Sequence, residues 1–285
     1  MSSKKIIAYQ GEPGANSHMA CADVYPGWET LPCASFEDAF AAIGEGRADL
    51  GMIPIENSLA GRVADIHHFL PGSGLHIIGE YFLPIHFHLL GVKGAKIEDL
   101  RSVYSHIHAL GQCRKIIREH NLKPVTHGDT AGSAREVAEW GDKSRASLAP
   151  QMAAEIYGLD VLARFVEDEE HNTTRFVILS RDAQRPPPGA APMLTTFVFR
   201  VRNVPAALYK ALGAFATNNI NMTKLESYMV NGEFAATQFL VDVEGHPEDA
   251  NLARALEELH FFSEEVRILG AYPAHPFRAR AAERT

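Results

Sequence analysis

Polar side chains end two segments that we predict to be strands. Glu56, Asn57 and Ser58 end the segment MIPIENS, with Gly61 after a short loop, and Ser105 ends RSVYS. Ligands of open α/β sheets bind beyond the carboxyl ends of the strands, so we predict that these side chains border a cleft. Local roles stay open: Asn57 or Ser58 would equally cap the following turn, and Ser105 would serve as a helix N-cap.

Two more segments carry polar groups that would reach the same cleft. Gln112 lies on the helix expected after Ser105, and HNTTRF enters a strand with Thr174 and Arg175. Neighbours along a strand point to opposite faces. Thr174 and Phe176 therefore share one face, where a hydroxyl and an aromatic wall would line a cleft together, while Arg175 lies on the other. As an isolated pattern this is weak, because Thr and Phe are common in strands.

The segment YQGEPGANSHMA places a glycine-containing loop between a strand and a helix. Such a loop offers N–H groups to an anion. Pro13 removes one of those groups and GxGxxG is absent, so a carboxylate suits the loop better than a pyrophosphate. Taken alone, the segment favours a structural turn over a binding loop.

Charge and composition limit the classes of ligand. The 285 residues include 27 Lys and Arg and 35 Asp and Glu, for a net charge of −8, without a long basic run. This excludes a nucleic-acid footprint and a polybasic membrane patch, and favours small molecules. MSSKK leads directly into a short apolar segment, so we expect no signal peptide and a cytoplasmic protein. The apolar residues 75–92 are too interrupted for a transmembrane helix.

Cysteine and histidine patterns favour neither disulfides nor a metal. The three cysteines, Cys21, Cys33 and Cys113, form no CxxC pair, which fits a reducing compartment. Cys113 precedes apolar positions and is predicted to be a small buried side chain rather than a nucleophile. Fourteen histidines are present, but none belongs to HExxH or to a Cys/His array, so we expect no metal site.

The elements that must position these residues alternate along the first 182 residues. Short β-type segments, KKIIAY, TLPCA, DLGMIPI, RSVYS, KPVTH, RASLA and RFVILS, are separated by helical stretches, which predicts an α/β domain. Ser35 and Asp38 form a capping box before one amphipathic helix. Further helices are expected at 17–25, 108–120, 130–140 and 150–157.

The proline-rich segment 183–193 is read as a linker. After it we predict strand 194–201, helix 205–217, strands 221–230 and 233–243, helix 247–262 and strand 265–272. The order βαββαβ predicts a ferredoxin-like (α+β) sandwich, with Asn231 and Gly232 in a hairpin turn. Residues 273–285 are charged and lack an apolar face, which predicts a mobile tail.

In chain order, YQGEPGANS, PIENSLAG, SHIHALGQC, GDTAGSA and TTRF resemble the successive signatures of the prephenate dehydratase family. NVPAALYKAL and LESYM resemble its ACT-type regulatory domain. The resemblance covers residues 6–272. It implies a two-lobed, periplasmic-binding-protein-like catalytic domain at 1–182, a linker at 183–193, a regulatory domain at 194–272 and a tail at 273–285. The lobes would be 4–82 with 175–180, and 84–164.

The resemblance implies conversion of prephenate to phenylpyruvate, water and CO2 in phenylalanine biosynthesis, without cofactor or metal. Thr174 would be the donor or general acid at the leaving hydroxyl, with Ser105 and Gln112 as further catalytic residues. The implied substrate-binding residues are Asn57, Ser58, Gly61, Thr130, Ala131, Arg175 and Phe176. For Arg175, a structural salt bridge is the competing interpretation.

Phenylalanine would regulate the enzyme from a pocket where two regulatory domains meet in a homodimer or a dimer of dimers. The implied allosteric residues are Asn203, Val204, Pro205, Ala206, Ala207, Leu208, Leu225, Glu226 and Ser227. Helix initiation with Pro205 in the first turn is the local alternative for NVPAAL.

The sequence departs from the family pattern at two places. The family's Ser-x-Pro-Gln is here Ser105, His106, Ile107, His108, and its Glu-Ser-Arg-Pro ends in Tyr228 and Met229. The second departure puts the strength or form of regulation in doubt. No chorismate mutase domain precedes Ile6, which implies a monofunctional enzyme. Two alternatives stay open, an arogenate dehydratase and a non-catalytic amino-acid-binding sensor.

Overall fold

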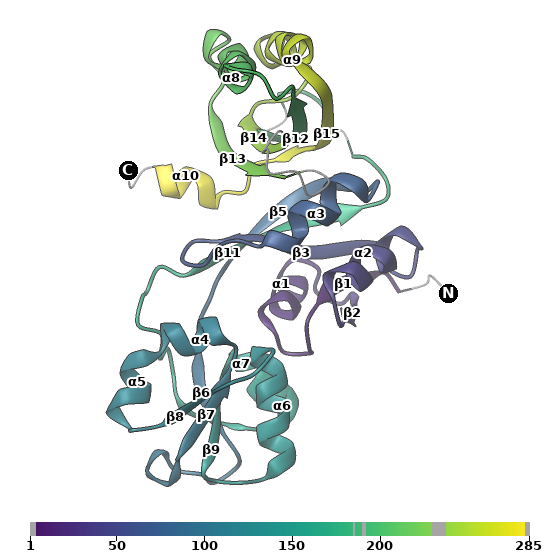
Figure 1. The fold of residues 1–285 in the computed structure, drawn as a ribbon. Helices are drawn as coiled ribbons and strands as arrows, with labels where there is room; N and C mark the ends of the chain where they lie inside the picture. The colour runs from purple at the N-terminus through teal and green to yellow at the C-terminus, as the bar shows by residue number, and fades with distance from the viewer. Residues whose placement is uncertain (1–3, 185, 190–191, 230–237, 283–285) are drawn as a thin grey trace. The chain divides into compact units, whose positions relative to one another are not determined.

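In the computed structural model, residues 4–184, 186–189, 192–229 and 238–282 are described (Figure 1). The chain packs as two compact units, residues 1–63 with 81–176 and residues 64–80 with 177–285. The predicted hairpin turn at Asn231 and Gly232 lies outside the described residues. No helix within the described ranges is long and apolar enough to cross a membrane.

The first sheet has the strand order β2-β1-β3-β11-β5, and β4 pairs with β3. Its strands are β1 (Ile6–Gln10), β2 (Glu29–Cys33), β3 (Leu50–Asn57), β4 (Gly61–Arg62), β5 (His76–Pro84) and β11 (Thr173–Ser180). Its helices are α1 (Asn16–Val24), α2 (Phe36–Gly44) and α3 (Ala64–Gly72). The predicted N-cap of α2 is confirmed: the Ser35 hydroxyl accepts a hydrogen bond from the Asp38 N–H at 3.1 Å.

The second sheet has the order β10-β6-β9-β7-β8, with parallel and antiparallel pairs. Its strands are β6 (His88–Gly91), β7 (Ser102–Ser105), β8 (Lys123–Thr126), β9 (Arg145–Ala149) and β10 (Asp160–Ala163). Its helices are η1 (Ile97–Asp99), α4 (Ile107–Gln112), α5 (Arg114–Glu119), α6 (Thr130–Trp140) and α7 (Gln151–Tyr157). The predicted α/β architecture is confirmed.

Helix α6 begins and ends as its sequence predicts. The Asp129 carboxylate accepts a hydrogen bond from the Gly132 N–H at 2.8 Å, and Gly141 follows the helix with a φ of 64°. By contrast, the single helix expected at 108–120 is wrong. The chain there forms α4 and α5, because Cys113 lies between them with a φ of −122° that no α-helix continues.

The C-terminal sheet has the order β13-β14-β12-β15, and all of its pairs are antiparallel. Its elements are β12 (Met193–Val201), α8 (Ala207–Thr217), β13 (Met222–Tyr228), β14 (Gln238–Glu244), α9 (Ala250–Phe262) and β15 (Ser263–Pro273). Both helices pack on one face of this sheet, where Phe197, Phe199 and Phe215 are at most 2% exposed. The predicted βαββαβ fold is confirmed. Helix α8 begins two residues after Pro205, so placing that proline in the first turn was wrong.

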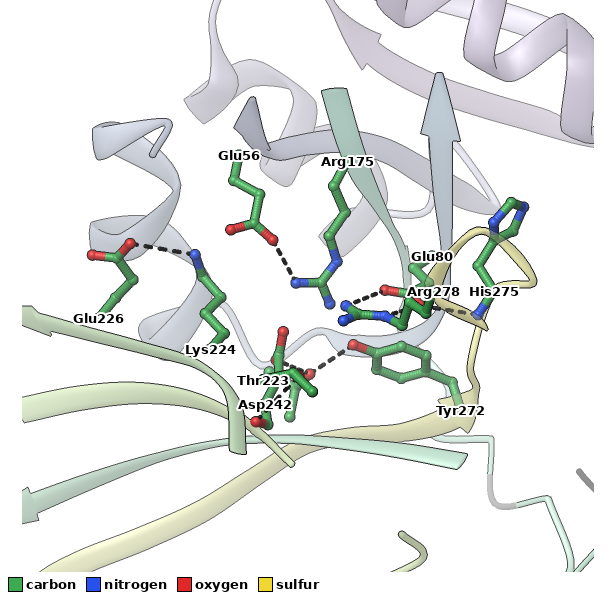
Figure 2. Close-up of polar contacts among 11 residues, drawn as sticks. Glu56, Glu80, Arg175, Thr223, Lys224, Glu226, Asp242, Tyr272, His275 and Arg278 are labelled. Carbon is green, nitrogen blue, oxygen red and sulfur yellow. Dashed lines mark hydrogen bonds and ion pairs between the residues drawn. The ribbon is translucent and has the colours of Figure 1, made fainter. Parts of the chain in front are cut away.

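Within the described part of the predicted tail, residues 273–282, the chain forms a helix, so the prediction of a mobile tail is wrong for these residues. Helix α10 (Phe277–Ala282) follows β15. The Arg278 guanidinium makes a bidentate pair with the carboxylate of Glu80, at 2.7 Å and 2.9 Å (Figure 2). The His275 N–H donates to the same carboxylate at 3.0 Å. The carboxylate partner lies almost 200 residues away, so the sequence around Arg278 contains no sign of it.

Gly270 of β15 marks a close approach within the second unit. A Cβ atom at this position would overlap the carbonyl oxygen of Ile77 in β5. Backbone therefore lies against backbone, which only glycine permits.

Candidate active site

A cavity of about 330 Å³ lies in the first unit and gathers several of the predicted site residues. Polar side chains and short loops from both sheets contribute to its wall. The lining residues are Gln10, Asn16, Asn57, Ala60, Ile85, Phe87, His106, His108, Ala109, Gln112, Gly128, Asp129, Thr130, Asn172 and Thr174. None of these described lining residues is Lys or Arg. The wall thus offers mainly neutral donors and acceptors.

Four of these side chains form a continuous hydrogen-bonded chain. The Asn57 Nδ2 donates to Thr174 Oγ1 at 2.9 Å and to Asn172 Oδ1 at 2.7 Å. The Asn172 Nδ2 donates to Gln112 Oε1 at 2.7 Å. We refer to Asn57, Asn172, Gln112 and Thr174 as the amide chain. It connects the end of β3 and the start of β11 with the last residue of α4.

The N-terminus of α6 forms another part of the wall. Asp129 and Thr130 both line the cavity. The first N–H groups of an α-helix have no partner within the helix, and they attract anions. The side chain of Ala131 is fully buried in the core. Of the two predicted residues, Thr130 therefore offers a hydroxyl and an N–H, whereas Ala131 offers its backbone only.

Two histidines of the SHIH segment, which departs from the family pattern, also line the cavity. The His106 Nδ1 accepts a hydrogen bond from the His108 N–H at 3.3 Å. Burial lowers the pKa of His106 and neighbouring His108 lowers it further, while Asp129 acts in the opposite direction. His106 is therefore neutral near pH 7, and since Nδ1 is an acceptor, the proton is on Nε2.

Ser105 lies outside the cavity lining. Its side chain is fully buried, and its hydroxyl donates to the Leu148 carbonyl at 2.6 Å. The alternative of Ser105 as the helix N-cap is wrong, because His106 occupies that position of α4. A catalytic role of Ser105 stays a prediction.

Ser58 and Gly61 are exposed and absent from the lining. The Ser58 hydroxyl donates to the His171 carbonyl at 2.8 Å and accepts from the Thr173 N–H at 2.9 Å. Ser58 thus joins the ends of β3 and β11, while Gly61 provides a positive φ of 79° in the turn at β4.

Strand β11 turns alternate side chains as its sequence predicts. Thr174 lines the cavity, whereas Arg175 is 3% exposed and pairs with Glu56 at 2.8 Å (Figure 2). Arg175 thus forms the ion pair of the competing salt-bridge interpretation, and its substrate-binding role stays a prediction. Phe176 is buried and outside the lining.

The glycine loop after β1 is a structural turn. The N–H groups of Gly11, Gly14 and Ala15 donate to Cys33, His18 and Glu12 respectively. Gly14 has a φ of 91°, and a Cβ atom there would lie 2.8 Å from the Cα of Ala153. Gln10 and Asn16, at the two ends of the loop, line the cavity instead.

Thiol and metal chemistry find little support. Burial raises the pKa of all three thiols, those of Cys21, Cys33 and Cys113, which keeps them neutral and weakly nucleophilic. In the part of the chain that the structure describes, no group of three or more His, Cys, Asp or Glu is placed to hold a metal ion.

The residues predicted to bind phenylalanine lie on two segments of the second unit. One is the loop into α8, where Ala206 has a positive φ of 63° and Val204 is exposed. The other is β13, where Leu225 is exposed and Glu226 pairs with Lys224 at 3.4 Å (Figure 2). Asn203, Pro205, Ala207, Leu208 and Ser227 belong to the same two segments.

The prediction missed one member of the amide chain. Asn172 belongs to the segment HNTTRF, of which only Thr174, Arg175 and Phe176 were predicted as site residues. The signal that could have found Asn172 is its position two residues before Thr174, because residues two apart along a strand share a face.

The chain is similar over almost its whole length to proteins of known description. The family model for prephenate dehydratase matches residues 7–184. A Komagataeibacter europaeus protein described as a bifunctional N-acyl-homoserine lactone acylase/prephenate dehydratase is 55% identical over 98% of this chain and 100% of the relative. An Arabidopsis thaliana chloroplastic arogenate dehydratase/prephenate dehydratase is 37% identical over 95% of this chain and 72% of the relative.

Solved structures agree. One described as GqqA, a novel type of quorum quenching acylase, has a TM-score of 0.91 and 56% identity, covering 96% of this chain and 100% of that one. Prephenate dehydratase from Arthrobacter aurescens in complex with L-Phe has a TM-score of 0.87 and 30% identity, covering 98% and 97%. With these sequence and structural matches, the chain belongs to the prephenate dehydratase family.

Proposed function

We propose that the protein is a prephenate dehydratase that converts prephenate to phenylpyruvate, water and CO2. The observation that carries this proposal is the presence of Thr174 and Gln112 in one cavity, joined through Asn57 and Asn172. Prephenate has two carboxylates and a ring hydroxyl. Its conversion needs a donor at the leaving hydroxyl, and further donors that hold the carboxylates.

A cavity wall without lysine or arginine suits this reaction. Gln112, Thr130 and His106 are uncharged donors that orient a carboxylate without the strong attraction of a cation. A guanidinium or ammonium group against the ring carboxylate would stabilise the ground-state anion and oppose the departure of CO2. Thr174 assists the hydroxyl as an oriented donor, and aromatisation of the ring supplies the driving force. Ile85 and Phe87 give the cavity its apolar surface.

The test is direct. Purified protein is incubated with prephenate, with chelator and without added cofactor, and phenylpyruvate is measured. Arogenate is assayed in parallel, and preferential formation of phenylalanine from it would make the protein an arogenate dehydratase. Saturable binding of an amino acid without turnover of either compound would identify a sensor.

Regulation by L-phenylalanine is the second part of the proposal. It rests on the C-terminal βαββαβ domain and on the similar Arthrobacter aurescens protein, whose structure is described as a complex with L-Phe. The ligand would lie between the segments 203–208 and 225–227 of two copies, which makes the protein a homodimer or a dimer of dimers. Exposed Val204 and Leu225 support a shared apolar pocket. Calorimetric titration with L-phenylalanine and light scattering test both points.

An acylase activity is a second candidate, favoured by the 55% identity with the Komagataeibacter europaeus protein. The reaction would hydrolyse the amide of an N-acyl-homoserine lactone to a fatty acid and homoserine lactone. Neutral, buried thiols leave no cysteine for this chemistry, so a polar cavity residue would have to activate water. Release of fatty acid, and its competition by prephenate, would show whether the two substrates share the cavity.

A further inference from the structure

Asn57 has no hydrogen-bonding capacity left for a ligand. Its Oδ1 accepts from the N–H groups of Leu59 at 3.0 Å and Ala60 at 2.8 Å. Those two backbone donors fix which end of the amide is oxygen. Its Nδ2 gives one hydrogen to Asn172 and one to Thr174. A carboxamide has two donor and two acceptor positions, and all four are in use.

The orientation of Asn57 determines the orientation of the next amide. Because Asn172 accepts from Asn57 through Oδ1, its other end must be Nδ2, which donates to Gln112 Oε1. Asn172 is 4% exposed. Reversing its amide would place its Nδ2 against the Asn57 Nδ2 and its Oδ1 against the Gln112 Oε1, at a cost comparable to a lost hydrogen bond. The direction is thus transmitted from two backbone N–H groups through the half-buried amide of Asn57 and the buried amide of Asn172.

At both ends of the amide chain, hydrogens remain for a ligand. Gln112 uses its oxygen on Asn172, which leaves the two hydrogens of Nε2. Thr174 uses a lone pair on Asn57, which leaves its own proton. We propose that Asn57 and Asn172 are positioning residues that fix this polarity, so that Gln112 Nε2 and the Thr174 hydroxyl both face the cavity as donors. The proposal deepens the proposed prephenate dehydratase function and rests on it for the identity of the ligand.

Three carboxylate variants separate polarity from charge. Asn57→Asp, Asn172→Asp and Gln112→Glu each replace one amide of the chain by an isosteric acid, so each adds the same charge to the same cavity wall. They differ in the direction they impose on Thr174. Only Asn57→Asp removes the hydrogen given to Thr174 and makes its hydroxyl donate to the new carboxylate, away from the substrate.

The expected kinetics follow from this difference. Asn57→Asp should lower kcat by about 100-fold or more, the loss expected for a misdirected proton donor. In Asn172→Asp, Gln112 turns its nitrogen toward the acid and its oxygen toward the substrate, which should raise KM by about tenfold while kcat changes little. Gln112→Glu should do the same. Equal losses of kcat in all three variants would overturn the proposal, because added charge alone would then explain them.

A second measurement does not depend on turnover. In the substrate-free wild-type protein, hydrogen exchange followed by NMR should be slow for the Asn57 Nδ2 hydrogens and fast for those of Gln112. Asn172→Asp should slow the Gln112 exchange, since that group becomes hydrogen-bonded. If the wild-type protein fails to convert prephenate but shows this exchange pattern, the proposed function fails and the polarity stands. Fast exchange at Asn57 would overturn the polarity itself. Melting temperatures of the variants exclude misfolding as the cause.

Discussion

The amide chain of the first unit and the Glu80–Arg278 pair of the second unit are both hydrogen-bonded polar clusters away from full solvent exposure, but they are built from different chemistry. Arg278 and Glu80 carry full charges and meet in a bidentate pair, with the carboxylate fully buried. The amide chain is neutral throughout. A charged pair holds two segments together strongly. Neutral amides hold segments more weakly, but each one has a donor end and an acceptor end, so a chain of them fixes the direction in which hydrogens point.

The largest effect is expected where the amide chain meets the substrate. Thr174→Val keeps the shape of the side chain and removes the hydroxyl. Turnover of prephenate should fall by at least about 100-fold, because a positioned donor is lost, while the melting temperature should change little because Thr174 is only partly buried. Steady-state kinetics and thermal unfolding check this. Near wild-type turnover in the folded variant would remove Thr174 from the mechanism.

Breaking the charged pair should have the opposite effect: stability should fall, and turnover of prephenate should change little. Arg278→Met leaves the Glu80 carboxylate buried without its guanidinium, and Arg278 is 23% exposed, so water compensates in part. We expect the free energy of unfolding to fall by about 2 kcal/mol. Denaturant titration measures the loss.

The matched control is Arg135→Met. Arg135 pairs with Glu139 at 3.0 Å and with Glu12 at 3.6 Å, but its side chain is 36% exposed. Such pairs on a helix surface contribute less than about 0.5 kcal/mol. Equal losses in the two variants would mean that burial adds nothing to the Glu80–Arg278 pair.

Ser105→Ala should lower the stability of the protein and leave its kinetics unchanged. The hydroxyl is fully buried and serves the Leu148 carbonyl. Its removal leaves that carbonyl short of one partner, which costs about 1 kcal/mol. A lowered melting temperature with unchanged kcat and KM is expected. Reduced kcat at an unchanged melting temperature would instead support the catalytic role that the family resemblance implies.

The smallest effect is expected in the pH dependence of stability, to which histidines contribute and the amides do not. Burial lowers the pKa of His18, His88 and His106. Below about pH 6.5 the unfolded chain therefore binds more protons than the folded one. The free energy of unfolding should fall as the pH drops, whereas the amide chain does not titrate.

Denaturant midpoints at about pH 7.5 and about pH 5.5 test this dependence across the range in which histidine titrates. His88→Asn retains an acceptor for the Phe165 N–H and should weaken the dependence. Stability that is constant or rises toward acid would contradict the assigned directions.

Local patterns predicted much of this architecture because they are read from neighbouring residues. Helix α6 covers the predicted residues 130–140, and alternation along β11 placed Thr174 and Arg175 on opposite sides. The rest depends on partners far away in the sequence. Gln112 and Asn172 meet across 60 positions, and Arg278 and Glu80 across 198. Neither meeting leaves a periodic or local mark, so the hydrogen bonds that join the amide chain and the helix α10 were not predicted.

Gly270 has a consequence for how this protein tolerates change. The obstacle to a side chain there is the Ile77 carbonyl, a backbone atom that cannot rotate aside. Even alanine, which adds one methyl group, would force β15 away from β5. Random mutagenesis with selection for folded protein should therefore find this position nearly invariant, although no side chain acts there. The constraint would be the short distance between the backbones of β15 and β5, which any Cβ atom at this position would increase.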